Sequence, residues 1–206
     1  LKINKLENWK TIKICIYIIL TKLHLKNQQN RIICQIFSTQ QIIAIKSRSN
    51  KQKIMTLSKQ LSGVSGEYYV AAELSRRGSL AAITLRNSEN IDILVSNIQG
   101  DKLFSIQAKT TQNKRKWILS KKIEEEKSEN KFYIFVNIPN EIDEKPEFFI
   151  IESKKLSVKI KLGHKNWLES LGKNDKIRKD SDVRQFDPIH FEKDLLSWED
   201  LIRLIN

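Results

Sequence analysis

The chain has 206 residues, of which 40% are hydrophobic and 30% charged, and its formal net charge at pH 7 is +13. The longest uninterrupted apolar run, residues 14–20, has seven residues, whereas a membrane-spanning helix needs about 20. Both cysteines, Cys15 and Cys34, lie near the start of the chain, which excludes a disulfide framework or a thiolate metal site from the rest. No secretory signal pattern is present either, so we expect a cytoplasmic location without membrane contact.

Composition changes sharply at Met55, the only methionine. Residues 1–54 contain 13 Ile but no Gly, Pro, Asp or Val, so most turn-forming residues are missing. Eleven Lys and Arg against one acid give this segment +10, whereas residues 55–206, with 26 basic and 23 acidic side chains, carry only +3. We predict that residues 1–54 are a poorly ordered N-terminal extension upstream of the natural start at Met55, and that residues 55–206 are a single domain. A genuine, weakly folded basic leader is the alternative.

Residues 62–78 (SGVSGEYYVAAELSRRG) predict an amphipathic helix that ends at Gly78. Glu67 falls on its apolar stripe, because the residues three, four and seven positions later are apolar. A buried carboxylate needs a cation or strong hydrogen-bond donors. Glu67 is therefore a candidate functional residue, whereas Glu73 faces two arginines and is expected to form ordinary surface pairs.

Residues 80–85 predict a first strand, and residues 90–111 (NIDILVSNIQGDKLFSIQAKTT) predict a hairpin of two more. Asp92 interrupts the otherwise apolar first strand of this hairpin. On the second strand, Gln107 and Lys109 project to the same side, since side chains alternate along a strand. The hairpin therefore gathers a carboxylate, an amide oxygen and an ammonium group at neighbouring strand ends.

The rest of the chain predicts four further elements. Residues 118–130 include a short charged helix, residues 131–138 form a strand buried on both faces, and residues 148–151 form another strand. A capping box that begins at Ser197 predicts a final helix. Residues 156–162 alternate as in a strand but also fit a helix, and both interpretations stay open.

The grouped polar residues suit metal-assisted hydrolysis of a phosphodiester. Mg²⁺ or Mn²⁺ prefers oxygen ligands, which Asp92, Glu67 and Gln107 would supply. Such a metal lowers the pKa of water and neutralises charge on the phosphate. Lys109 would orient the water or stabilise the transition state. The alternative is that Asp92, Gln107 and Lys109 form only a surface salt bridge and a polar pair at a strand edge.

The order of a helix with Glu67, a strand, a strand with Asp92 and a strand with Gln107-x-Lys109 resembles the PD-(D/E)XK nuclease superfamily. Its Holliday-junction resolvase and Mrr-type branches look most similar, and the resemblance covers residues 63–136. It implies an α/β fold with a restriction endonuclease-like core, an αβββαβ mixed sheet flanked by helices. Two residues depart from the pattern: Ile91 replaces the proline before Asp92, and Gln107 replaces the second strand acid. The second change removes one negative charge from the metal site and makes Glu67 more important.

The resemblance implies a Mg²⁺- or Mn²⁺-dependent endonuclease that hydrolyses phosphodiester bonds in DNA. RNA is a second candidate substrate, and a homodimer is expected because many such nucleases act as dimers. Because Gln107 is neutral, a catalytically inactive nuclease fold that serves nucleic-acid binding or complex assembly remains the alternative.

Two basic clusters could contact phosphates, although a solvated charged surface explains each cluster equally well. The first, directly after the motif strand, consists of Lys114, Arg115 and Lys116. The second marks a later loop and consists of Lys173, Lys176, Arg178, Lys179 and Arg184.

Overall fold

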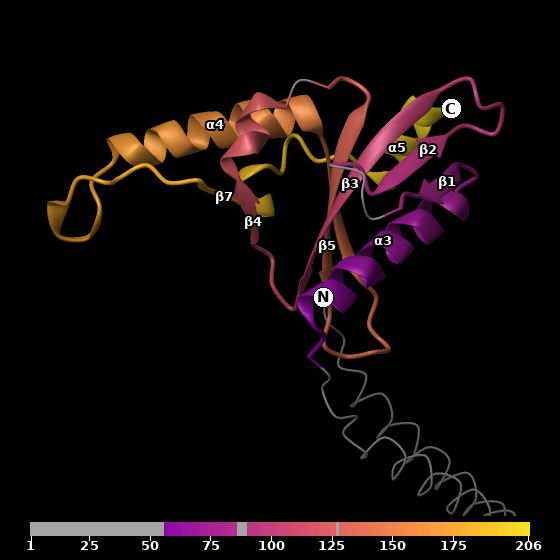
Figure 1. Ribbon diagram of the computed structural model, residues 1–206, viewed down its shortest axis with the longest axis horizontal. Coiled ribbons are helices and arrows are strands. Elements are labelled where there is room, and N and C mark those ends of the chain that lie inside the picture. The colour runs from indigo at the N-terminus through magenta and orange to yellow at the C-terminus, as the bar shows by residue number, and fades with distance from the viewer. Residues whose placement is uncertain (1–55, 86–89, 127) are drawn as a thin grey trace, which may run out of the picture. The chain divides into compact units, whose positions relative to one another are not determined.

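The computed structural model describes residues 56–85, 90–126 and 128–206 (Figure 1). The predictions for the extension, residues 1–54, lie outside the described residues. The strands and helices that follow are, in chain order, α3 (Lys59–Ser75), β1 (Leu80–Ile83), β2 (Ile93–Ser96), β3 (Leu103–Gln112), β4 (Trp117–Ser120), β5 (Lys131–Ile138), β6 (Glu147–Glu152), α4 (Ser153–Glu169), β7 (Val183–Phe186) and α5 (Trp198–Ile205). No helix in these described ranges is both long and apolar enough to cross a membrane.

Five strands form one mixed sheet in the order β1-β2-β3-β5-β6. The β1–β2, β2–β3 and β5–β6 neighbours are antiparallel, whereas β3 and β5 run parallel. A second sheet has two strands, because β4 pairs with β7 in antiparallel register. The five-stranded mixed sheet with flanking helices confirms the predicted α/β class, and the order α3, β1, β2, β3 follows the predicted core.

Each face of the five-stranded sheet covers a separate hydrophobic core. The first core contains α3 and α5, through side chains such as Val70, Leu74 and Leu201, packed on Ile93 and Ile106 of the sheet. Figure 1 shows α3 and α5 to one side of the central strands, with α4, β4 and β7 to the other.

The second core lies under α4 and the small sheet. Leu156 and Ile160 of α4 pack there with Trp117 of β4, Phe186 of β7 and Phe135 of the large sheet. The ring centroids of Phe135 and Phe186 are 3.8 Å apart in a stacked arrangement. Strand β5 contributes side chains to both cores, which explains why its sequence is almost continuously apolar.

Local sequence signals explain where several elements begin and end. Ser58 caps α3 by accepting a hydrogen bond from the Leu61 N–H, so the helix begins before the predicted residue 62. Gly78 follows α3 with a φ of +89°, a conformation that favours glycine. At the other end of the chain, Ser197 and Asp200 form the predicted capping box of α5.

Two regions differ from or complete the predictions. The short charged helix predicted within residues 118–130 is a 3-10 helix, Lys121–Glu125, and it follows a strand, β4, that the sequence did not predict. Trp117 and Leu119 of β4 point inward and pair with a strand more than 60 residues later, a contact that no local pattern specifies. Residues 156–162 are helical, because Leu156 and Ile160, four residues apart, pack on the sheet while Val158 and Leu162 are exposed.

A buried ion pair joins the small sheet to the 3-10 helix. Arg184 of β7, whose side chain is only 2% exposed, pairs with Glu124, which is 12% exposed. Arg184 also donates to the Val183 carbonyl at 3.0 Å. This residue from the second predicted basic cluster therefore stabilises the fold instead of facing a partner.

Candidate active site

Asp92 lies immediately before β2, and hydrogen bonds hold it against β3. The Ala108 N–H donates to Asp92 Oδ2 at 2.8 Å, and the Asp92 N–H donates to the Ile106 carbonyl at 3.0 Å. On its other side, the Thr84 N–H donates to the Asp92 carbonyl at 2.9 Å. The carboxylate therefore occupies a defined position where β2 begins, beside the middle of β3.

The strand registers bring Asp92, Gln107 and Lys109 to one face of the sheet. Ile93 pairs with Ile106, and both face the first core, so their neighbours Asp92 and Gln107 point to the opposite face. Lys109 shares that face because it lies two residues after Gln107. The structure thus places together the three side chains that the hairpin sequence predicts to be neighbours.

Gln107 is buried, and its amide makes no hydrogen bond within the described ranges of the chain. Lys109 is half-buried and makes no ion pair there. Buried polar groups normally have partners. An amide oxygen and an ammonium group that lack them, next to a half-buried carboxylate, are groups that a ligand could satisfy.

Burial raises the pKa of the Asp92 carboxyl above its ordinary value of 3.8, while the Ala108 N–H and the charges of Lys109 and Lys131 oppose that rise. The raised pKa means that ionised Asp92 costs folding free energy at neutral pH. A divalent cation bound beside the carboxylate would remove this cost.

We therefore expect Asp92→Asn to melt at a higher temperature than the wild type at pH 7 without metal. The asparagine keeps an oxygen for the Ala108 N–H but buries no charge. Because the folded pKa is raised, the cost in the wild type disappears as the pH falls below about 4. Thermal unfolding from pH 8 to pH 4 should show the two melting temperatures converging, and a wild type more stable at pH 7 would contradict this reading of Asp92.

Lys131, Tyr133 and Glu126 also belong to this face, and sequence reasoning missed them. The parallel register sets Tyr133 of β5 beside Gln107. Lys131, only 5% exposed, pairs with Glu126 and lies 5.4 Å from the centroid of the Tyr133 ring. Burial, followed by the charges of Glu126 and Asp92, raises the pKa of Tyr133, which therefore stays protonated.

A weak sequence signal for these residues existed. Lys131 and Tyr133 are the polar positions of an apolar run, and they alternate on one face. Their neighbours across the sheet depend on the β3–β5 register, which no local pattern specifies.

Glu67 lies on α3, the helix that covers the opposite face of the sheet. The fully buried stripe of α3 runs through Gly66 and Val70, so Glu67 lies beside this stripe and is half-buried. Gly66 contacts Thr110, the residue after Lys109. Glu67 is therefore near the part of β3 that carries Lys109 and Thr110. Its carboxylate would reach the Asp92 face only by passing around the start of β2.

The predicted phosphate-binding cluster, Lys114, Arg115 and Lys116, lies in the exposed loop between β3 and β4. Two of its members are paired: Arg115 Nε donates to Glu147 at 2.9 Å, and Lys116 lies 3.2 Å from Asp187. The Arg115–Glu147 pair is exposed and therefore weak, so Arg115 can exchange partners, whereas the partner of Lys116, Asp187, is mostly buried.

The donor set fits a hard divalent cation. Asp92 offers a carboxylate and Gln107 an amide oxygen that accepts no hydrogen bond from the described residues, and both oxygen types suit Mg²⁺ or Mn²⁺. Groups of three or more His, Cys, Asp and Glu arranged for a metal ion are not found in the described part of the chain. Any metal held here would thus need the Gln107 amide, water or substrate oxygens to complete its shell.

No protein-family model and no curated protein matches the chain. Among solved structures, the chain is similar to Hjc, a Holliday junction resolvase from the archaeal hyperthermophile Archaeoglobus fulgidus, with 12% sequence identity. The similarity covers 68% of this chain and 93% of that chain, with a TM-score of 0.40. A functional proposal for this chain therefore rests on its own residues.

Proposed function

We propose that this protein is a metal-dependent endonuclease of the PD-(D/E)XK type, which hydrolyses phosphodiester bonds in DNA. The observation that carries the proposal is the grouping of Asp92, Gln107 and Lys109 on one face, where β2 begins beside β3. Among the described residues, the Gln107 amide makes no hydrogen bond and Lys109 no ion pair, and burial disfavours the ionised Asp92 carboxylate. A bound cation and a phosphate would satisfy all three.

In this proposal, Asp92 and Gln107 would hold Mg²⁺ or Mn²⁺, and Glu67 would add a second carboxylate around the start of β2. A divalent cation at this position would make water a better nucleophile and neutralise charge on the phosphate. The Ala108 N–H keeps the Asp92 carboxylate oriented. Lys109 positions the attacking water and stabilises the negative charge that develops on the phosphate oxygens.

The test is cleavage by the full chain of supercoiled, linear and branched DNA, and of matched RNA, with Mg²⁺, Mn²⁺ or a chelator. We expect metal-dependent cleavage by the wild type and a loss of at least about 100-fold in Asp92→Asn, because the variant lacks a charged ligand. Asp143→Asn, a change in the exposed β5–β6 loop, is the matched control. Equal cleavage by Asp92→Asn and the control would refute the assignment of Asp92.

Gln107 supports a second candidate, a nuclease fold that binds nucleic acid without cutting it. Because Gln107 carries no charge, Asp92 is the carboxylate that the hairpin directs toward the site. A single carboxylate holds a divalent cation weakly. A wild type that binds DNA but cuts no substrate with either metal would favour this second function. Cleavage gained by Gln107→Glu would then identify the missing charge as the reason.

A further inference from the structure

Within residues 55–206, excess positive charge is concentrated in residues 153–182, which we call the basic arm. This segment has nine Lys and Arg against four Asp and Glu, a net charge of +5, whereas residues 55–206 as a whole carry +3. The remainder of residues 55–206 therefore has a net charge of −2. Such segregation of charge creates a local positive potential that attracts polyanions.

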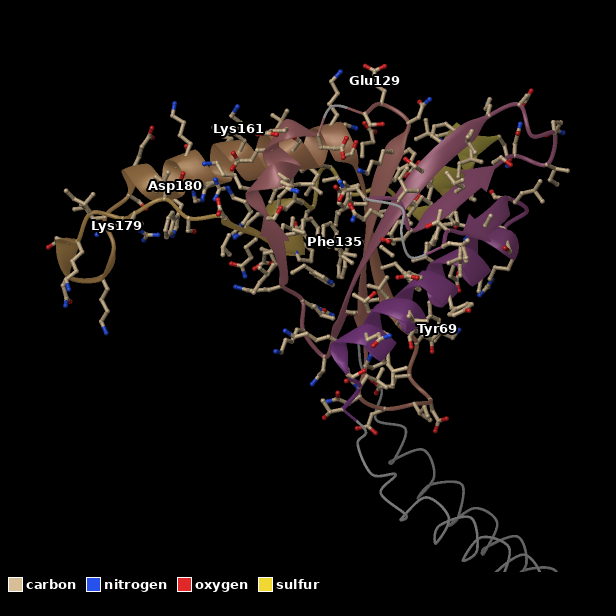
Figure 2. The ribbon with its side chains drawn as sticks, in the orientation of Figure 1. Tyr69, Glu129, Phe135, Lys161, Lys179 and Asp180 are labelled. Carbon is tan, nitrogen blue, oxygen red and sulfur yellow. The ribbon has the colours of Figure 1, made fainter. Side chains whose placement is uncertain are left out.

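The basic arm consists of α4 and the loop that leads to β7. The first half of α4 is anchored in the second core through Leu156 and Ile160. Figure 1 shows the rest of α4 and the loop extending away from the strands. Lys161 and Lys179 lie on this extension, one on the helix and one on the loop (Figure 2).

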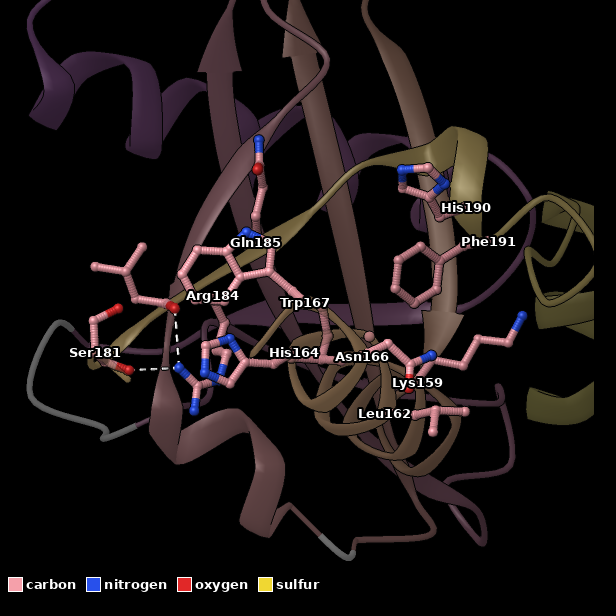
Figure 3. Close-up of a pocket in the computed structure, with 13 residues that line it drawn as sticks. Lys159, Leu162, His164, Asn166, Trp167, Ser181, Arg184, Gln185, His190 and Phe191 are labelled. Atoms are coloured by element: carbon pink, nitrogen blue, oxygen red, sulfur yellow. Dashed lines mark hydrogen bonds between the residues drawn. The ribbon is translucent and has the colours of Figure 1, made fainter. Parts of the chain in front are cut away.

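Several contacts fasten the loop to the helix. The Arg178 guanidinium of the loop lies 4.7 Å from the centroid of the Trp167 ring on α4, and within α4 this ring stacks on that of His164, with the centroids 5.4 Å apart. His164 Nε2 lies 2.7 Å from Asp180 Oδ1. The cavity of about 560 Å³ between α4 and β7 is lined by His164, Trp167 and Arg184 (Figure 3). The arm thus presents its lysines from a fixed framework.

Among the described residues, Glu169–Lys165 is the one ion pair between an acid and a lysine of the arm. Acids outside the arm, Glu129, Glu152 and Asp194, pair with Lys154, Lys155 and Lys159. Asp180 contacts His164 and, at 3.1 Å, Lys121 outside the arm. Glu169 lies 3.8 Å from Lys165. Among the described residues, the arm lysines that are exposed and make no ion pair are Lys161, Lys173, Lys176 and Lys179.

We propose that the basic arm binds the phosphate backbone of duplex DNA while the Asp92 face acts on it. This inference rests on the proposed function, in which DNA is the polyanion that the protein binds. Lysines are suited to this task because each is a point charge that contacts phosphates without reading sequence. Lys154, Lys161 and Lys165 lie on one side of α4 and span about 16 Å of helix, long enough to meet several phosphates of one groove. Lys154 and Lys165 form ion pairs with Glu129 and Glu169, but both pairs are exposed and weak, so phosphates can replace these carboxylates.

The test is binding of a short duplex by the full chain in EDTA, measured by fluorescence anisotropy across a series of KCl concentrations. Lys161→Gln/Lys179→Gln should reduce the slope of log affinity against log salt by about 2, and weaken binding at 0.1 M salt about tenfold or more. The matched control is Lys59→Gln/Lys102→Gln, which removes two exposed lysines outside the arm that also lack an ion pair among the described residues. This control should behave as the wild type.

Equal binding by the two double variants would overturn the arm proposal. So would an arm variant that loses binding to phosphatidylserine vesicles but keeps its affinity for DNA, since the arm would then be a membrane contact. Cleavage is scored separately, so the two proposals can fail independently. A wild type that cuts DNA but needs no arm lysine refutes the arm alone, whereas arm-dependent binding without cutting supports the arm and refutes the nuclease.

Discussion

Lys109→Ala should lower the rate of metal-dependent DNA cleavage by about 10²- to 10⁴-fold while leaving the affinity for DNA within a few-fold of the wild type. Lys109 lies two residues after Gln107, on the face that holds Asp92, and its charge acts on the Asp92 carboxyl. Removing it takes away stabilisation of the transition state but little of the area that contacts DNA. Single-turnover cleavage and equilibrium binding, measured on the same substrate, separate the two effects.

The control for this experiment is Lys102→Ala, which removes an exposed lysine from the β2–β3 hairpin. It should cut at the wild-type rate. Lys109→Arg adds a second check, because a guanidinium keeps the charge but not the compact shape of an ammonium, and we expect partial activity. Wild-type cleavage by Lys109→Ala would remove Lys109 from the mechanism, and equal loss of binding and cleavage would assign it to substrate affinity.

Gly66→Ala should lower the free energy of unfolding by about 1 to 3 kcal/mol and the melting temperature by about 3 to 10 °C. A Cβ on Gly66 would lie 1.8 Å from Oγ1, 2.9 Å from Cβ and 3.0 Å from Cγ2 of Thr110. Rotating the threonine cannot relieve all three contacts, so α3 must move away from β3. This loss exceeds the roughly 1 kcal/mol that alanine gains over glycine inside a helix.

Gly63→Ala is the matched control. Gly63 lies on the same helix, α3, but a Cβ there would have no neighbour within 4 Å. It should stabilise the protein by about 0.5 to 1 kcal/mol. Thermal and urea unfolding of both variants, with Gly66→Ala/Thr110→Ala as a rescue, measure the effect. A Gly66→Ala protein as stable as Gly63→Ala would show that α3 is not held tightly on Thr110.

Gly66→Ala also tests whether the position of Glu67 matters for activity. Because Glu67 follows Gly66 directly, displacing α3 moves its carboxylate relative to β3. Positioning errors of about 1 Å can cost about 100-fold in rate. The role of Glu67 as a metal ligand stays a prediction, and so do the phosphate contacts of Lys114, Arg115 and Lys116.

Local patterns in the sequence were sufficient for much of the fold and for the grouping of three site residues. The hairpin of residues 90–111 alternates with a period of two, and a register slip of one residue would turn its apolar side chains out of the core. Asp92, Gln107 and Lys109 therefore had to share a face once the apolar residues faced the core. The capping box at Ser197 and the apolar strand β5 could be predicted for the same reason, because each sequence pattern lies within a few residues.

Tertiary structure alone decided what surrounds those three residues. The parallel β3–β5 register, which joins strands separated by a long crossover, sets Tyr133 beside Gln107 and brings Lys131 to the Asp92 face. The same holds for the pairing of β4 with β7, which the sequence did not predict, and for the packing of α3 on the face opposite Asp92. Hydrogen bonds and side-chain periodicity act between near neighbours, whereas contacts between distant segments form only where they bury a shared core.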